Sequence, residues 1–244
     1  KKAMSQYHVA VRKPVMTPFM NTKVYSNPSP SVGGTLIIFL LRLLQENNNE
    51  NIEISHLVNA MAITNQARQD ICTDPNQEYQ INQLLDDNVF SKYLKQLECQ
   101  ILKYGDRGKL SGRGETTHVS VIDKDLNAAS VTTTNGEGCG YIIPGTGIML
   151  NNMLGEADLN PLGFHRWAHP MRLPTMISPT IIMKDEHPYV LLGSGGSNRI
   201  RSAIVQVIIK YINHDIDLRD AVWSPRIHLE GNDLYFEPGT EILS

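Results

Sequence analysis

Residues 115–123 read Glu115-Thr116-Thr117-His118-Val119-Ser120-Val121-Ile122-Asp123. Their alternation predicts a β-strand, preceded by a polar loop at 110–114 and followed, after a turn, by a second strand-like run at 128–134. A threonine at the head of a strand is unreactive while its nitrogen stays in a peptide bond. If the bond before Thr116 is cut, the free amine can activate the hydroxyl of the same residue, because an α-amino group has a pKa of about 8. A strand with exposed threonines is the plainer interpretation.

Further blocks of sequence decide between these interpretations. In chain order they are residues 24–35, 116–121, 127–135, 144–152, 178–180, 193–196 with 199–200, and 221–226. From residue 116 onward the blocks resemble the small subunit of the γ-glutamyltranspeptidases, a family of N-terminal-nucleophile hydrolases. Residues 24–35 resemble the end of the family's large subunit. The resemblance implies that 1–115 belongs to the large-subunit region and 116–244 to the small-subunit region, as parts of one sandwich domain.

Length and composition are those of an ordinary globular protein. The chain has 244 residues, 41% hydrophobic and 19% charged, enough for one large domain or two small ones. A net charge of −3 gives no reason to expect nucleic acid or an anionic membrane as partner. The longest apolar run, residues 36–41, is too short to span a bilayer. Three widely spaced cysteines predict neither a disulfide framework nor a metal motif. Localisation is left open, because the resemblance places the first residue inside the family's sequence.

Hydrophobic periodicity predicts a layered α+β architecture. The expected helices cover residues 33–45, 54–67, 89–102 and 200–211, and the expected strands lie at 23–25, 117–122, 128–134, 180–183, 189–192 and near 227 and 234. The resemblance implies the four-layer αββα sandwich of the N-terminal-nucleophile hydrolases. That sandwich is expected to be partial, since most of the large subunit is missing.

Thr116 is the expected nucleophile, because the family places its nucleophile there. In a strand, Thr116 and His118 point to one face and Thr117 to the other, so we expect Thr117 to support or pack. His118 could act as a general base. Since the free amine already serves that purpose, we expect His118 to be structural.

Thr134 and Asn135 end the second strand and precede a glycine. Asn-Gly is a strong turn signal, so a plain hairpin turn is one interpretation. The resemblance implies that Thr134 hydrogen-bonds the nucleophile and that Asn135 helps to hold the α-carboxylate of the substrate. The sequence is shorter here than in better-known members of the family.

Glu156 lies in a block, residues 151–156, in which the family has an acidic residue that receives the α-amino group of a γ-glutamyl donor. An ammonium group in a pocket needs an anionic partner. Many members have aspartate at the position of Glu156 and glutamine where Met153 stands. A surface glutamate is the plainer interpretation.

The segment 172–180 stands where the family has a Ser-Ser-Met sequence. Counting back from residues 178–180 without gaps, Thr175 and Met176 replace the two serines. The Thr175 hydroxyl can still bind substrate, whereas the thioether of Met176 offers no donor. This departure affects recognition of the substrate carboxylate.

Residues 193–199 form a glycine-rich loop between an expected strand and an expected helix. Backbone amides at a helix start favour negative charge. A phosphate-binding loop is a rival interpretation, but the Gly-Lys-Ser/Thr ending is missing; a tight turn is another. The resemblance implies that Gly195 and Gly196 supply the amides that stabilise the tetrahedral oxyanion.

His165 and His169 have a spacing that would suit zinc on a helix. No acidic base accompanies them, and Pro161, Gly163 and Pro170 argue against a helix. No metal or other cofactor is expected.

Three functions remain. The first is a γ-glutamyl transferase or hydrolase, cleaved before Thr116, that passes the acyl group of a glutathione-like donor to water or an amino acid. The second is an acylase or amidase for another γ-linked or β-lactam-type substrate. The third is an uncleaved, inactive scaffold or fragment. The expected partner is the missing large-subunit portion of the same precursor.

Overall fold

The computed structural model describes residue 5 and residues 7–47, 51–71, 80–99, 105–106, 116–168 and 171–240. Its largest sheet has the strand order β1-β2-β6-β7, formed by Val15–Phe19, Thr22–Ser26, Thr180–Lys184 and His187–Leu192. Neighbouring strands in this sheet are antiparallel. β2 thus joins the first part of the chain to a hairpin more than 150 residues later.

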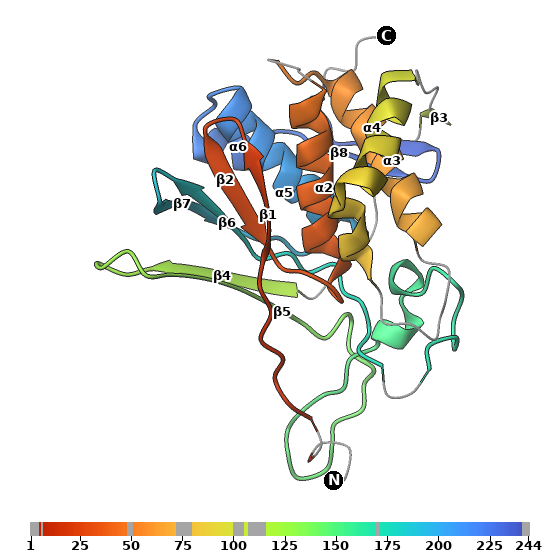
Figure 1. The fold of residues 1–244 in the computed structure, drawn as a ribbon. Helices are drawn as coiled ribbons and strands as arrows, with labels where there is room; N and C mark the ends of the chain where they lie inside the picture. Colours follow the sequence, from red (N-terminus) through yellow and green to blue (C-terminus); the bar gives the residue numbers. More distant parts are fainter. Residues whose placement is uncertain are drawn as a thin grey trace.

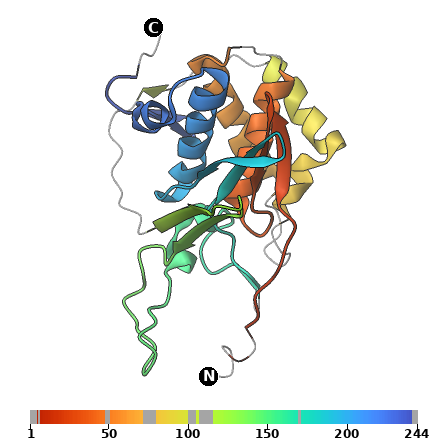
Figure 2. The same cartoon turned by 90° about the vertical axis from the view of Figure 1, so that its left-hand side faces the viewer.

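Helices cover one side of this sheet (Figures 1 and 2). They are α2 (Val32–Glu46), α3 (Ile54–Ile71), α4 (Asp87–Cys99), α5 (Ile200–Ile208) and α6 (Leu218–Trp223). A π-helical turn, Ile209–Asn213, extends α5, and a 3-10 helix, Ile81–Leu85, precedes α4. α2 is the centre of the core, with twelve of its fifteen residues buried. None of the helices in the described part of the chain is long and apolar enough to cross a membrane.

Two smaller sheets complete the fold. β8 (Ile227–Glu230) and β9 (Asp233–Phe236) form a hairpin beside β3 (Gly105–Asp106). β4 (Thr116–Ile122) and β5 (Ala128–Thr134) form a separate two-stranded hairpin. This β4–β5 hairpin lies on the side of β6 and β7 that faces away from α2 and α3 (Figure 1).

The α+β class agrees with the expectation, but the four-layer sandwich is not confirmed. The described residues provide a helix layer, a sheet and the β4–β5 hairpin, and no second helix layer covers the outer face of this hairpin among them. The predicted helix 89–102 begins earlier, at Asp87, and is described to Cys99. β1 was not predicted at all.

The start of α2 fixes the segment that carries Thr175. The Thr175 carbonyl accepts hydrogen bonds from the backbone amides of Val32 (2.9 Å) and Gly33 (3.3 Å). A side chain at Gly33 would overlap the Met176 carbonyl, so only glycine allows this close approach. The N-terminus of the most buried helix therefore anchors residues 175 and 176.

Candidate active site

The β4–β5 hairpin brings Thr116 and Thr134 together. They are direct cross-strand partners, and the Thr116 hydroxyl donates a hydrogen bond to the Thr134 hydroxyl over 3.1 Å. The Thr134 oxygen also accepts the backbone amide of Gly136 over 2.9 Å. This second bond orients the Thr134 hydroxyl toward Thr116. Glu115 lies outside the described residues, so the bond before Thr116 is not described.

His118 shares the inner face of β4 with Thr116, but its ring is engaged elsewhere. One ring nitrogen, Nδ1, lies 2.8 Å from the Thr132 hydroxyl, and the other, Nε2, lies 2.8 Å from the Ser120 hydroxyl. Burial lowers the pKa of His118 and so favours the neutral ring. The ring also lies against Gly193, where a side chain would overlap it. These contacts agree with a structural role for His118.

The glycine loop after β7 reaches Thr116. A β-carbon added to Gly195 would lie 3.1 Å from the Thr116 carbonyl oxygen and 3.2 Å from the Thr116 β-carbon. Gly196 has φ +120° and Ser197 has φ +53°, and the short helix Ser197–Arg199 then leads into α5. The loop therefore carries its backbone close to Thr116 at a helix start.

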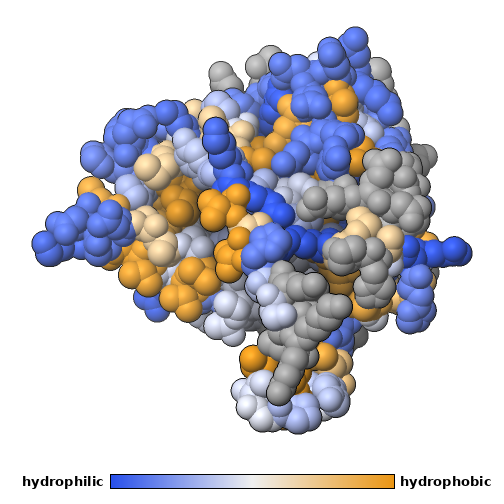
Figure 3. All heavy atoms as spheres, turned by 60° about the horizontal axis from the view of Figure 1, so that its bottom comes forward, coloured by the Kyte–Doolittle hydropathy of each residue, from blue (hydrophilic) through white to orange (hydrophobic). Residues whose placement is uncertain are grey.

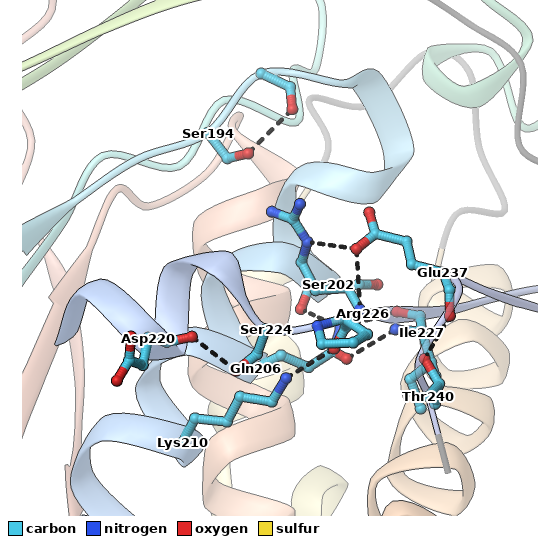
Figure 4. A network of polar contacts seen from close by, with 12 residues as sticks. Ser194, Ser202, Gln206, Lys210, Asp220, Ser224, Arg226, Ile227, Glu237 and Thr240 are labelled. Carbon is cyan, nitrogen blue, oxygen red and sulfur yellow. Dashed lines mark hydrogen bonds and ion pairs between the residues drawn. The ribbon is translucent and has the colours of Figure 1, made fainter. Parts of the chain in front are cut away.

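A polar network holds α5, and with it this loop, against β8 (Figure 4). The buried Gln206 amide donates to the carbonyls of Ser202 and Ile227, each over 2.8 Å, and its oxygen accepts the Ile227 amide over 2.8 Å. Lys210 donates to the Pro225 carbonyl over 2.7 Å. Because both the nitrogen and the oxygen of the Gln206 side-chain amide are hydrogen-bonded, α5 is fixed relative to β8.

A cavity of about 260 Å³ opens beside Thr116. Five of the seven predicted site residues line it: Thr116, Thr134, Glu156, Thr175 and Gly196. They come from the β4–β5 hairpin and from three loops, the last of which leads from β7 to α5. Sequence analysis missed two further carboxylates of its wall: Glu137, which follows Gly136 after β5, and Glu230, the last residue of β8. Neither lies in a distinctive sequence pattern.

Glu156 is a carboxylate without a partner in this wall. It lies between two 3-10 turns, Met153–Gly155 and Ala157–Leu159. Its Oε1 atom is buried and accepts no hydrogen bond from the described residues. Burial raises the pKa of Glu156, and the negative charges of Asp158 and Glu137 raise it further. A half-buried carboxylate whose buried oxygen has no partner favours a cationic ligand group.

Two predicted site residues, Gly195 and Asn135, do not line the cavity; Gly195 still lies against Thr116, whereas Asn135 points elsewhere. Its side chain is exposed and it is not among the lining residues, although it adjoins Thr134. Its carbonyl accepts the amides of Gly138 (3.0 Å) and Asn152 (3.2 Å). Because Gly136 follows with φ +66°, the backbone turns sharply here. A role for Asn135 in carboxylate binding stays a prediction.

Thr175 and Met176 also line the cavity. The Thr175 hydroxyl accepts the Ile177 amide over 3.3 Å, and the buried Met176 side chain offers the cavity only a thioether. His165 lies in a turn rather than a helix, and His169 lies outside the described residues. No group of three acidic, His or Cys side chains suited to a metal occurs in the described ranges.

A sequence profile of γ-glutamyltranspeptidases matches residues 1–242. The chain belongs to this family. It is 27% identical to the glutathione hydrolase proenzyme of Bacillus subtilis strain 168 over 278 aligned residues, covering 100% of this chain and 47% of that protein. It is 28% identical to an acylase proenzyme of Pseudomonas sp. strain SE83, covering 96% and 44%. The chain thus spans about half the length of the curated relatives it matches.

Among solved structures, the fold of this family member resembles that of a cephalosporin acylase from Bacillus halodurans. The TM-score is 0.77 at 19% identity, over 98% of this chain and 45% of that one. At this identity the similarity concerns the fold. The resemblance to γ-glutamyltranspeptidases expected from the sequence is confirmed, and the relatives include both hydrolases and acylases.

Proposed function

We propose that this chain is the nucleophile-bearing half of a γ-glutamyl transferase or hydrolase that is cleaved before Thr116. The observation that carries the proposal is one cavity lined by the Thr116–Thr134 hydroxyl pair and by Glu156, a half-buried carboxylate whose buried Oε1 atom has no hydrogen-bond partner among the described residues. An N-terminal threonine needs no separate base, and a γ-glutamyl group carries an ammonium that suits this carboxylate.

The proposed reaction passes through an ester on Thr116. The Thr116 oxygen bonds to the γ-carbonyl carbon of the donor while the α-amine of Thr116 takes the hydroxyl proton. Backbone amides of the Gly195–Gly196 loop stabilise the oxyanion. The C–N bond of the donor then breaks, and the amine passes its proton to the leaving nitrogen. Water or the amine of an amino acid attacks the ester and releases Thr116.

An acylase for a different acyl group is the second candidate. It is favoured by Met176, which places a thioether where a donor to the substrate carboxylate is expected. An acylase without γ-glutamyl preference requires no contact with an α-ammonium. The two candidates therefore differ in what Glu156 does.

Glu156→Gln in the full-length protein tests this difference. We expect kcat/KM for a γ-glutamyl donor to fall more than tenfold, since breaking a buried charge pair costs roughly 2–5 kcal/mol. A glutaryl donor, which lacks the α-amino group, is expected to be unaffected, and cleavage before Thr116 is expected to persist. Steady-state kinetics with both donors measures the effect.

Glu137→Gln is the matched control, because Glu137 lines the same cavity but is exposed. It is expected to change kcat/KM less than threefold, as is usual for exposed charges. If the unmodified protein hydrolyses glutaryl and γ-glutamyl donors equally well, the acylase candidate replaces the γ-glutamyl proposal.

We also propose that the remaining half of the precursor covers the outer face of the β4–β5 hairpin. On this face Val119, Val121 and Val131 are 53%, 55% and 51% exposed. Viewed from this side, hydrophobic residues adjoin the polar hairpin turn at the left (Figure 3). A groove of about 240 Å³ lies on the other side of the hairpin, between His118 and the apolar side chains of β7, α5 and α6. A two-stranded hairpin is marginal by itself, so a covering segment would stabilise it.

Val119→Asp combined with Val131→Asp tests this assignment. The two residues are cross-strand partners, so the double variant places two unpaired charges at the proposed interface. We expect the two pieces of the cleaved protein to dissociate at least about a hundredfold more readily. Size-exclusion chromatography of the cleaved protein measures this dissociation. Val119→Thr with Val131→Thr, which preserves shape and β-propensity, is the control; association unchanged in the aspartate variant would contradict the assignment.

A further inference from the structure

The segment that carries Glu156 has little regular structure to hold it. Between residues 151 and 167 it contains only two three-residue 3-10 turns, with Glu156 at their junction. The buried Oε1 atom of Glu156 receives no hydrogen bond from the described residues. The direction of the carboxylate is therefore set by its backbone and by whatever fixes that backbone.

Asn160 fixes that backbone. Its side chain is buried, with 5% exposed, and its amide nitrogen donates to three carbonyls: Met153 over 3.1 Å, Leu154 over 3.3 Å and Glu156 over 2.7 Å. The shortest bond goes to Glu156 itself. Three carbonyls of one turn thus converge on one NH₂ group, which only asparagine or glutamine offers as a neutral, short double donor.

Trp167 holds the other end of the Asn160 amide. The indole nitrogen of Trp167 donates to the Asn160 side-chain oxygen over 3.0 Å, and the Trp167 ring packs against the core. This bond fixes the orientation of the amide, because a reversed amide would face the indole N–H with its own donors. The turn around Glu156 is thereby tied to the core through two side chains.

A second tie comes from α3. The Arg68 guanidinium donates to a carboxylate oxygen of Asp158 over 2.8 Å and also to the Asp158 backbone carbonyl, and both side chains are mostly buried. A two-point contact from a helix fixes position as well as charge. Asp158 lies two residues beyond Glu156, so this ion pair fixes the same short segment that Asn160 holds.

We propose that Asn160 is a positioning residue that, with Trp167 and the Arg68–Asp158 pair, aims the Glu156 carboxylate into the cavity and so sets the preference for donors with a free α-amino group. The inference rests on the proposed function of Glu156. A carboxylate displaced by about 1 Å from its working geometry can lose up to about a hundredfold in rate. The loss should fall on the donor's ammonium contact, because Asn160 lies behind Glu156 and is not among the residues that line the cavity.

Asn160→Asp tests the inference with almost no change of volume, because it replaces the NH₂ group by an oxygen that faces three carbonyl oxygens. In the full-length protein we expect the ratio of kcat/KM for γ-glutamyl over glutaryl donors to fall at least about tenfold, mostly through KM. Cleavage before Thr116 and turnover of the glutaryl donor should stay unchanged. Trp167→Phe, which removes the indole donor, should lower the same ratio by a smaller factor.

The control is Asn127→Asp at the exposed turn of the β4–β5 hairpin, which is expected to leave the ratio unchanged. An equal loss with both donors in Asn160→Asp would show a general structural role and overturn the inference. If Asn160→Asp does not fold, an unchanged ratio in Trp167→Phe overturns it instead. If the unmodified protein does not distinguish the two donors, the proposed function and the inference both fail. If the unmodified protein prefers the γ-glutamyl donor and Asn160→Asp keeps the same preference, only the inference fails.

Discussion

Replacing Thr116 by alanine is expected to leave the full-length protein uncut and without turnover. The hydroxyl that would attack both the preceding peptide bond and the donor is absent in Thr116→Ala, while its partner Thr134 remains. Removing a nucleophile that forms an acyl-enzyme has cost about a millionfold in kcat in another hydrolase. Denaturing electrophoresis should show one chain where the unmodified protein gives two, the smaller beginning at Thr116 by N-terminal sequencing.

Thr117→Ala is the matched control for this experiment. Thr117 has the same chemistry one residue later, but it lies exposed on the outer face of β4, and it does not line the cavity. Cleavage and turnover should persist in it. A mature protein that stays uncut yet turns over substrate would contradict the N-terminal-nucleophile mechanism, and an uncut, inactive protein would favour the scaffold hypothesis.

Local patterns predicted the part of the fold that surrounds Thr116. β4, β5, β6 and β7 were located within two residues, because alternating side chains end in clear turn signals such as residues 123–127. β1 was missed because Val15–Phe19 contains Pro18 and lacks a matching pattern. The pairing of β2 with β6 was beyond such reasoning, since periodicity carries no information about partners far apart in sequence.

The candidate site was predictable where one hairpin or one loop defines it. The Thr116–Thr134 pair follows from the β4–β5 register, which the turn between the strands sets. Asn135 follows Thr134 directly. Whether its side chain reaches the cavity depends on the backbone angles after Thr134, which composition does not fix. The Asn160 network was invisible for a similar reason, since its bonds depend on how an irregular segment folds back on itself.

Gly196→Val is expected to lower kcat by about a hundred- to a thousandfold, the usual cost of one lost oxyanion donor, about 2.7–4 kcal/mol. Gly196 has φ +120°, a conformation that a β-branched residue cannot adopt without strain, so the variant should move the amides of the loop away from Thr116. KM should change little, because the lost interaction belongs to the transition state. Steady-state kinetics and binding of an unreactive donor analogue to the full-length protein separate the two effects.

Gly145→Val is the control for strain alone, since Gly145 also has positive φ, at +75°, but a β-carbon there meets no atom within 4 Å. It is expected to keep its turnover. Gly195→Ala adds a graded comparison, because its β-carbon would lie only 3.1 Å from the Thr116 carbonyl oxygen and should displace the nucleophile by a few tenths of an ångström. Loss of kcat in both loop variants but not in Gly145→Val would assign the effect to the geometry between the loop and Thr116. Near-normal kcat in Gly196→Val would mean that the loop is only a turn and that the oxyanion is stabilised elsewhere.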